Sequence, residues 1–409
     1  MTVVAVWNIE HYGAKGYGRL QDYSGIHDFV AAYQQLISAN VIVIQEFKSP
    51  GDVKLTALAK TLGNDWSADW VKGALNQEVS PQTDPNSLTQ SNLTWGSNSE
   101  GYALLFEGKA VQPLASKMSI GITGQHYMQL STEGLDTYAI AGEGFNVITN
   151  SGFTNPTYFN VSSSPQLVMA PSKESTRLNI DYVARAEQAL ESIKLHGYAR
   201  RPCEIRLADD TWLVAYHAPV DSTNCVYAVQ LLAAAQSIAR DGKVIVGGDF
   251  NVVGEAARKQ AFGNLDQAGL KLFGGAVPPP SSVSFGKDDA EINSDNVNDF
   301  LGSNRDVLFS RGIGFTEVGV SHLLQILTAP SNAKQAEFAQ AVVRSDAIKN
   351  MVSTNHPYGL PPNNPAWLQA WDSMKNEFGP HATHLTKPVY AAMLYRGYVS
   401  DHLPVMLAY

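Results

Sequence analysis

Polar residues that suit metal-assisted phosphate chemistry follow short apolar stretches at several points of the chain. Glu46 comes just after the apolar residues 41–44, and Gly248-Asp249-Phe250-Asn251 closes a second apolar run. Ser400-Asp401-His402 stands just before the apolar residues 404–407. Because buried strands reach the surface at the edge of a sheet, carboxylates, amides and imidazoles at their ends can meet there. The clusters therefore predict a site at one sheet edge.

The chemistry that these residues support is cleavage of a phosphoester. It needs neutralised phosphoryl charge, a deprotonated water and a proton for the leaving oxygen. Mg²⁺ prefers carboxylate oxygens, so Glu46 at a strand end is a suitable ligand. Asp249 and Asn251 are two residues apart and point the same way, so one can deprotonate a water while the other binds phosphate. His217 and His402, when protonated, can stabilise phosphoryl charge or protonate the leaving oxygen.

Each of these residues has a simpler interpretation when it is considered alone. A strand-end glutamate usually faces solvent, a Gly-Asp pair is common in turns, and a single histidine is usually a surface or structural residue. The combination of two strand-end histidines with Glu46, Asp249 and Asn251 favours the catalytic interpretation.

Alternating strand and helix patterns predict the elements that position these residues. Short runs rich in β-branched residues, bounded by Gly, Pro, Asn or Asp, are typical of strands. They cover residues 3–7, 41–44, 102–106, 203–207, 212–216, 244–246, 307–309 and 404–407. Helical spacing recurs in residues 26–37, with Ser24 as the cap, and in 180–193 and 226–238. No linker divides them, so we expect one α/β (α+β) domain over residues 1–409, a four-layer sandwich of two mixed β-sheets flanked by helices.

Three segments read as additions to this core. Residues 78–98 are rich in Ser, Asn, Thr, Gln and Pro and predict an exposed loop, and residues 108–199 form an extended segment. Residues 322–387 predict a helical insertion near the C-terminus, in which Asn364 caps a helix with Pro365 in its first turn. Since this insertion connects two strands that carry polar clusters, we expect its body over or beside the cleft.

Composition limits the classes of function. The 409 residues carry a net charge of −9, so a protein that coats nucleic acid through a general basic surface is disfavoured, whereas an enzyme with a local metal is not. Cys203 and Cys225 make no disulfide framework, and whether they pair is open. No apolar run reaches the roughly 18 residues of a membrane span, and the N-terminus lacks a secretory signal. We expect a cytoplasmic protein, with a secreted, trimmed form as the alternative.

Eight polar blocks of the chain resemble, in their order, those of the endonuclease/exonuclease/phosphatase superfamily, which has a pancreatic-deoxyribonuclease-like fold. The blocks are Trp7-Asn8-Ile9-Glu10, Gln45-Glu46, Glu100-Gly101-Tyr102, Arg200-Arg201-Pro202, Tyr216-His217-Ala218, Gly248-Asp249-Phe250-Asn251, Asn304-Arg305-Asp306 and Ser400-Asp401-His402. Any one block is weak evidence, but the ordered set from residue 7 to residue 402 is specific.

The resemblance implies a hydrolase that uses Mg²⁺ or Mn²⁺, with Ca²⁺ as a structural ion. Asn8, Glu46 and Asp401 would hold the metal, with Glu10 as a further contact. The chain departs from the family just after this block, where His11-Tyr12 replaces a glycine-rich stretch.

The resemblance also implies roles in catalysis. Asp249 would position or deprotonate the attacking water, Asn251 would bind the phosphate, and His402 would lie on the phosphate, oriented by Asp306. Glu100 would pair with His217 in the same site. Tyr102 and Arg200 would contact the phosphate.

The substrate is less well defined than the reaction. The Glu100 and His217 pair and the Arg200 block resemble the deoxyribonuclease branch, so a nuclease acting on DNA or RNA is the first expectation. The alternatives are a phosphatase or phosphodiesterase acting on an inositol phosphate, a phospholipid head group or another small phosphoester, and a non-catalytic binding module on the same fold. The sequence leaves the oligomeric state open.

Overall fold

The computed structural model describes residues 1–10, 12, 22–48, 53–72, 101–111, 203–218, 243–262, 271–273, 280–285, 291–320, 322–361 and 363–409. Between residues 122 and 169 it describes six short strands. The expected loop at 78–98, the expected helices at 180–193 and 226–238, and the residues Glu100 and Arg200 lie outside the described part of the chain.

Two mixed sheets form the centre of the described fold. The six-stranded sheet has the order β16-β17-β1-β2-β4-β3, and the five-stranded sheet has the order β11-β12-β13-β15-β14. The first consists of β1 (Val3–Asn8), β2 (Val41–Phe47), β3 (Trp66–Lys72), β4 (Gly101–Glu107), β16 (Glu317–Val320) and β17 (Val405–Ala408). The second consists of β11 (Cys203–Arg206), β12 (Trp212–Ala215), β13 (Val244–Asp249), β14 (Lys271–Leu272) and β15 (Asp306–Arg311). Each sheet has one parallel pair, β1 with β2 and β12 with β13, among antiparallel ones.

The predicted strands are confirmed, and three described strands of these sheets were not predicted. β3 mixes Trp and Val with Ser, Asp and Lys, while β14 and β16 are only two and four residues long. Their pairing with strands that the sequence does predict supplies the stability that their own sequence does not indicate. These three strands therefore form because of their pairing in the sheet and not because of their local β-propensity.

Alternating side chains fill the space between the two sheets. Val4 and Val6 of β1 belong to the same buried cluster as Leu213 of β12, Ile245 of β13 and Leu308 of β15. Because successive side chains of a strand point to opposite faces, the other residues of β1, such as Trp7, face the helices instead. Every second residue of a strand thus faces the other sheet. A residue at the end of a strand that continues this alternation also points between the sheets.

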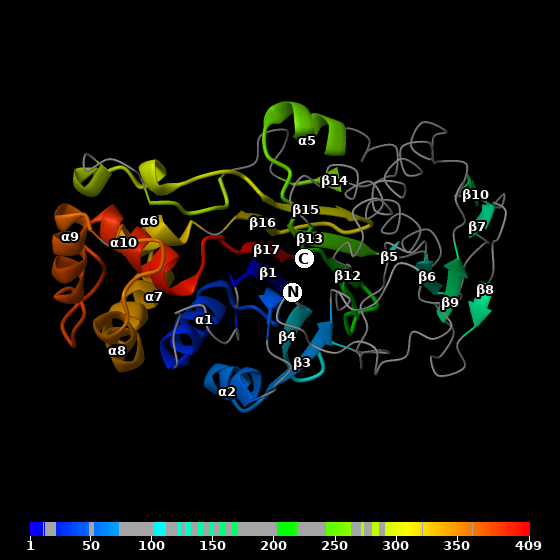
Figure 1. The fold of residues 1–409 in the computed structure, drawn as a ribbon. Helices are drawn as coiled ribbons and strands as arrows, with labels where there is room; N and C mark the ends of the chain where they lie inside the picture. Colours follow the sequence, from blue (N-terminus) through cyan, green and yellow to red (C-terminus); the bar gives the residue numbers. More distant parts are fainter. Residues whose placement is uncertain are drawn as a thin grey trace.

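Helices cover the outer faces, as Figure 1 shows. Helices α1 (Ser24–Ile37) and α2 (Val53–Leu62) lie on one side, and α5 (Glu255–Phe262) lies on the other, where Phe262 contacts Phe250 and Phe309. The expectation that Ser24 caps α1 was wrong. Tyr23 precedes the helix without a side-chain cap, and the Ser24 hydroxyl donates to Asp22. No helix in the described ranges is both long and apolar enough to cross a bilayer.

The segment at 322–387 is helical, as predicted. It contains α6 (Leu323–Thr328), α7 (Ala333–Arg344), α8 (Asp346–Thr354) and α9 (Pro365–Lys375), and α10 (Pro388–Leu394) follows it. Asn364 caps α9 by accepting from the N–H groups of Ala366 and Trp367, which confirms the predicted start with Pro365.

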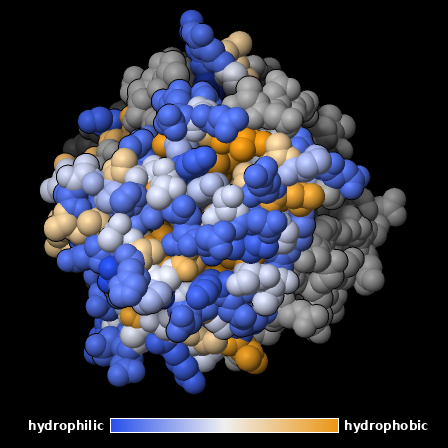
Figure 2. Space-filling view, turned by 90° about the vertical axis from the view of Figure 1, so that its left-hand side faces the viewer, coloured by the Kyte–Doolittle hydropathy of each residue, from blue (hydrophilic) through white to orange (hydrophobic). Residues whose placement is uncertain are grey.

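Two helices of this segment, α7 and α8, pack on α1, and the position of the insertion relative to the cleft stays a prediction. Phe338 of α7 contacts Phe29 of α1 with ring centroids 5.6 Å apart. A Cβ on Gly25 of α1 would lie 2.8 Å from Met351 Sδ of α8, so these two helices approach closely. Figure 2 faces this end of the molecule and shows a largely hydrophilic surface with separate apolar patches. The apolar residues of the insertion therefore extend the core.

A buried histidine in α1 makes stability depend on pH. His27 Nε2 lies 3.0 Å from the Tyr12 hydroxyl, and burial lowers the pKa of His27 to about 4, although Asp22 and Asp28 oppose the shift. The unfolded chain takes up a proton near pH 6.5 and the folded chain does not. The free energy of unfolding should therefore fall as the pH drops from 6.5 towards 4, by up to about 3 kcal/mol.

The measurement is urea unfolding of the wild type and of His27→Gln at pH 7 and pH 5. The wild type should lose about 2 kcal/mol more than the variant between these two values. Equal losses in both proteins would contradict the assignment of this pH dependence to His27.

Candidate active site

Strand-end residues in phase with the inner faces meet between the two sheets. Asn8 ends β1 after Val4 and Val6, and Asp249 ends β13, where it lies opposite Asp306 at the start of β15. His217 follows β12 in phase with Leu213. All of these polar residues are buried, so their positions follow from the same alternation that builds the core.

Glu46 reaches this space through an irregularity of β2. The pairing of β2 with β4 shifts register between Ile44 and Phe47, and Glu46 has φ 57° in the left-handed region. In a regular strand, Gln45 and Glu46 would point to opposite faces. Here Gln45 Oε1 accepts from the backbone N–H of Asp249 at 3.0 Å, while the Glu46 carboxylate also faces the site. The bulge thus aims two consecutive side chains into one space, which is a common use of bulges beside functional sites.

Gly248 permits the close approach of β13 to its neighbours. It has φ 139°, and a Cβ there would lie 2.2 Å from Gln45 Nε2 and 2.3 Å from the Tyr216 carbonyl oxygen. Any other residue would displace Gln45, which holds the backbone of Asp249. The Gly-Asp sequence therefore serves a packed site and not a simple turn.

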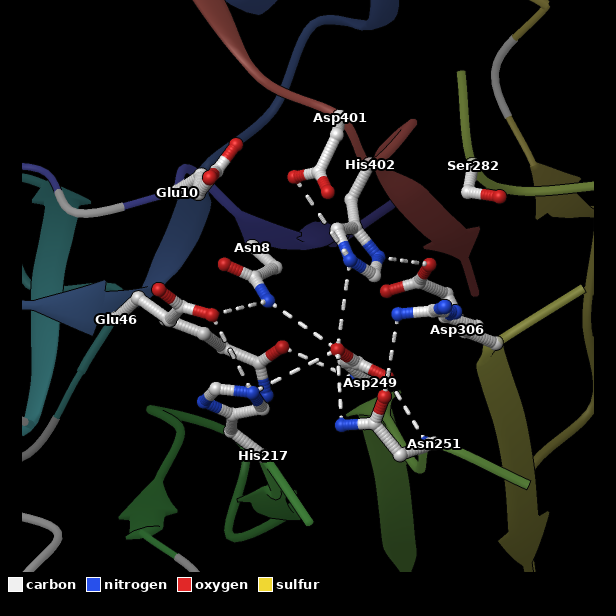
Figure 3. A network of polar contacts seen from close by, with 12 residues as sticks. Asn8, Glu10, Glu46, His217, Asp249, Asn251, Ser282, Asp306, Asp401 and His402 are labelled. Atoms are coloured by element: carbon white, nitrogen blue, oxygen red, sulfur yellow. Dashed lines mark hydrogen bonds and ion pairs between the residues drawn. The ribbon is translucent and has the colours of Figure 1, made fainter. Parts of the chain in front are cut away.

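The amide of Asn8 joins the two sheets. Its Nδ2 donates to Glu46 Oε1 at 3.2 Å and to Asp249 Oδ2 at 3.2 Å. His217 Nε2 lies 3.5 Å from Glu46 Oε1 and 3.6 Å from Asp249 Oδ2. Figure 3 shows these side chains pointing toward one another from strands of both sheets.

His402 lies between two buried carboxylates. Its Nδ1 is 2.8 Å from Asp306 Oδ2, and its Nε2 is 3.5 Å from Asp249 Oδ2. Burial alone would lower the pKa of His402, but the carboxylates of Asp306, Asp249 and Asp401 outweigh it and raise the pKa well above its ordinary value. A carboxylate that holds one ring nitrogen fixes the orientation of the imidazole, so Nε2 is directed toward Asp249.

Asn251 lies beside Asp249 in a constrained backbone. It has φ 51°, its backbone N–H donates to Asp249 Oδ1 at 2.9 Å, and its Nδ2 donates to the Ala218 carbonyl oxygen at 2.8 Å. Arg305 Nη1 lies 3.5 Å from Asn251 Oδ1 and brings a guanidinium to the same edge. Asparagine tolerates the left-handed region better than most residues, which fits its place here.

Two groups of residues fit a divalent cation. In the first, Asn8 Oδ1 and Asp401 Oδ1 are buried and accept no hydrogen bond from any described residue, and Glu46 lies beside Asn8. Oxygen atoms left without a donor in this way suit Mg²⁺ or Mn²⁺. In the second, Asp249, Asp306 and His402 offer ligand atoms within 4.8 Å of one another. The bond from His402 to Asp306 occupies part of the second group, so the first fits a cation better.

Tyr102 lies beside His217, and its expected contact with phosphate stays a prediction. Its ring is buried and its hydroxyl accepts from the backbone N–H of His217 at 3.1 Å, so it supports His217 from behind. The expected partner of His217, Glu100, and the expected phosphate ligand Arg200 lie outside the described residues.

Ser281 and Tyr395 help to fix the site but carried no recognised signal in the sequence. The Ser281 hydroxyl accepts from the backbone N–H groups of Arg305 and Asp306, at 2.9 and 2.8 Å. The carbonyl oxygen of His402 accepts from Trp7 Nε1 at 2.9 Å and from the Tyr395 hydroxyl at 2.6 Å. Ser281 lies in a Pro- and Ser-rich stretch without a motif, so only the fold shows its role.

The chain matches the Endonuclease/Exonuclease/phosphatase family over residues 5–402 and belongs to that family. Members of the family hydrolyse phosphoesters and typically depend on a divalent metal. No curated protein is significantly similar to the chain.

The chain also matches solved structures, among them the following three. A family member from Leptotrichia buccalis is 12% identical, with 100% of this chain and 98% of that chain covered and a TM-score of 0.38. A mannosyl-6-phosphatase from Bacteroides thetaiotaomicron is 11% identical, with 100% and 98% covered and a TM-score of 0.41. A 3′ phosphatase from Neisseria bound to a product DNA hairpin is 11% identical, with 100% and 99% covered and a TM-score of 0.40.

Proposed function

We propose that this chain is a Mg²⁺- or Mn²⁺-dependent phosphodiester hydrolase whose substrate is a nucleic acid. The observation that carries the proposal is the convergence of Asn8, Glu46 and Asp249 from both sheets, with His217 and His402 beside Asp249. Two carboxylates, an amide and two imidazoles gathered around Asp249 are the groups that phosphoester cleavage requires.

The charge of the site supports the need for a cation. Glu46, Asp249 and Asp401 place negative charge where an anionic phosphate must bind, and in a partly buried site that repulsion is weakly screened. A divalent ion held by Asn8, Glu46 and Asp401 would supply Lewis-acid stabilisation of the phosphoryl oxygens. A diester carries less negative charge than a monoester, so it is the better match to this acidic site.

The side chains of the chain itself have distinct roles in this proposal. Asp249 accepts the proton of the attacking water. Its Oδ2 lies at the centre of the network, where Asn8, Asn251 and His402 orient the carboxylate. His402, held by Asp306, binds the phosphate and donates a proton to the leaving oxygen. His217 stabilises charge on the opposite side of Asp249.

Nucleic acid as substrate is supported by the sequence blocks that resemble the deoxyribonuclease branch, among them Glu100 and Arg200. The test is a panel of plasmid DNA, single-stranded DNA, RNA, sphingomyelin and inositol phosphates. Cleavage of a nucleic acid at a higher kcat/KM than every small ester supports the proposal. Preference for an inositol phosphate or a lipid head group would favour the small-ester alternative instead.

Chelation should abolish the reaction. With EDTA in excess, turnover should fall to background, and added Mg²⁺ or Mn²⁺ should restore it, because the ligands of the first group are all oxygen atoms. Parallel preparations of Asp249→Asn control for a contaminating nuclease. Full activity in EDTA would exclude the mechanism.

A further inference from the structure

The edge of the first metal group carries an ion pair that no part of the proposed mechanism uses. Arg396 Nη1 donates to Glu10 Oε2 at 2.7 Å, with only 18% and 13% of the two side chains exposed. Arg396 lies in the π-helical turn η7 (Tyr395–Val399), between α10 and Asp401. Turns of this kind are rare and often occur at functional sites. The two charges of a pair so shielded from solvent attract each other more strongly than those of a surface pair.

Glu10 lies beside the residues that fit the cation. It follows Asn8 by two positions, and Figure 3 shows it with Glu46 and Asp401 around the Asn8 amide. An uncompensated carboxylate there would attract the cation and repel a phosphate. The guanidinium of Arg396 compensates the negative charge of Glu10 through their ion pair.

The insertion holds Arg396 in place. The guanidinium lies over the ring of Tyr358, 5.3 Å from its centroid, and the backbone N–H of Tyr358 donates to the Gly397 carbonyl oxygen at 2.9 Å. A Cβ on Gly397 would lie 2.6 Å from Pro357 Cβ, so only glycine allows this contact. The loop around Tyr358 is thus a part of the insertion that reaches the site.

We propose that Arg396 is a positioning residue, supported by Tyr358, that fixes Glu10 in their ion pair and cancels its charge, so that Asn8, Glu46 and Asp401 bind the metal. This inference rests on the proposed function, because it assumes a cation at those three residues. Glu10 is therefore not a metal contact, unlike the role that the family resemblance implies for it.

The test measures Mn²⁺ affinity by calorimetry without substrate, and kcat/KM separately, in four proteins. These are the wild type, Arg396→Met, Glu10→Gln and the double variant. Arg396→Met should bind Mn²⁺ more tightly, on the order of tenfold, because it exposes the Glu10 charge. Its KM for an anionic substrate should rise. Glu10→Gln should bind Mn²⁺ more weakly by a similar factor, and the double variant should return to within about twofold of the wild type.

Lys375→Met is the matched control, because Lys375 also pairs with an acid, Asp372, and lies over a ring, Trp371, within the same insertion. It should leave the Mn²⁺ affinity unchanged. A merely structural role for Arg396 would produce no opposite shifts in Arg396→Met and Glu10→Gln.

Weaker or unchanged Mn²⁺ binding by Arg396→Met would overturn the inference, as would a double variant that behaves like either single one. If Arg396→Met does not fold, Arg396→Gln takes its place, and weaker or unchanged Mn²⁺ binding by that variant would refute the inference. Absence of Mn²⁺ binding in the wild type would overturn the proposed function together with it. Binding in the wild type without these shifts would overturn the inference alone.

Discussion

Asp249→Asn is expected to lower kcat by a factor on the order of 10² to 10⁴. The amide has nearly the shape of the carboxylate but cannot accept the proton of the attacking water. It also places an N–H₂ group at one of the two acceptor positions, either Oδ1, which accepts from the Asn251 N–H, or Oδ2, which accepts from the Asn8 amide. The measurement is the initial rate at saturating Mg²⁺ on the best substrate of the panel, together with the unfolding midpoint.

Asp210→Asn is the matched control for this variant. Asp210 lies in the turn between β11 and β12, is exposed, and has φ 65°, a conformation that asparagine tolerates. The same chemical change there should leave kcat within about twofold of the wild type, since surface changes away from the site are small. Wild-type turnover in Asp249→Asn would mean that another residue is the base.

Asp306→Asn is expected to have the second largest effect, a loss in kcat on the order of 10²-fold or more. The amide no longer fixes the orientation of His402 through Nδ1, a bond of 2.8 Å in the folded protein. It also removes a carboxylate that raises the pKa of His402. Since the proposed mechanism uses His402 in its protonated form, the alkaline limb of the pH–rate profile should move to lower pH.

The pH–rate profile shows whether Asp306 acts by orienting His402 or only by stabilising the fold. A variant that is only misfolded in part would lose activity at every pH without a shift of the limb. An unchanged alkaline limb in a folded, slower Asp306→Asn would therefore show that His402 is not the titrating acid.

Much of the fold was predictable because the strands are apolar runs with clear boundaries. The residues at their ends, such as Asn8, Asp249 and Asp306, then follow from the period of two and from adjacent pairing of β13 with β15. Glu46 is different. Regular alternation would turn it away from the face of Gln45, and only the bulge with φ 57° brings both to the site.

Other contacts could not be predicted because their partners are far apart in the chain. Arg396 and Glu10 are separated by 386 positions, and nothing in the spacing of either residue indicates the pair. The helices of the insertion were predictable from their periodicity, but periodicity shows only that one face is buried. It does not show that Phe338 of α7 packs on Phe29 of α1.

Diffraction from crystals soaked in Mn²⁺, recorded with the anomalous signal of the metal, tests the central claim most directly. We predict one peak at coordination distance, about 2.1 Å, from oxygen atoms of Glu46, Asn8 and Asp401, with Asp249 facing it across the substrate position. Glu10 should stay paired with Arg396. A peak between Asp249, Asp306 and His402, or no peak at saturating Mn²⁺, would contradict the assignment.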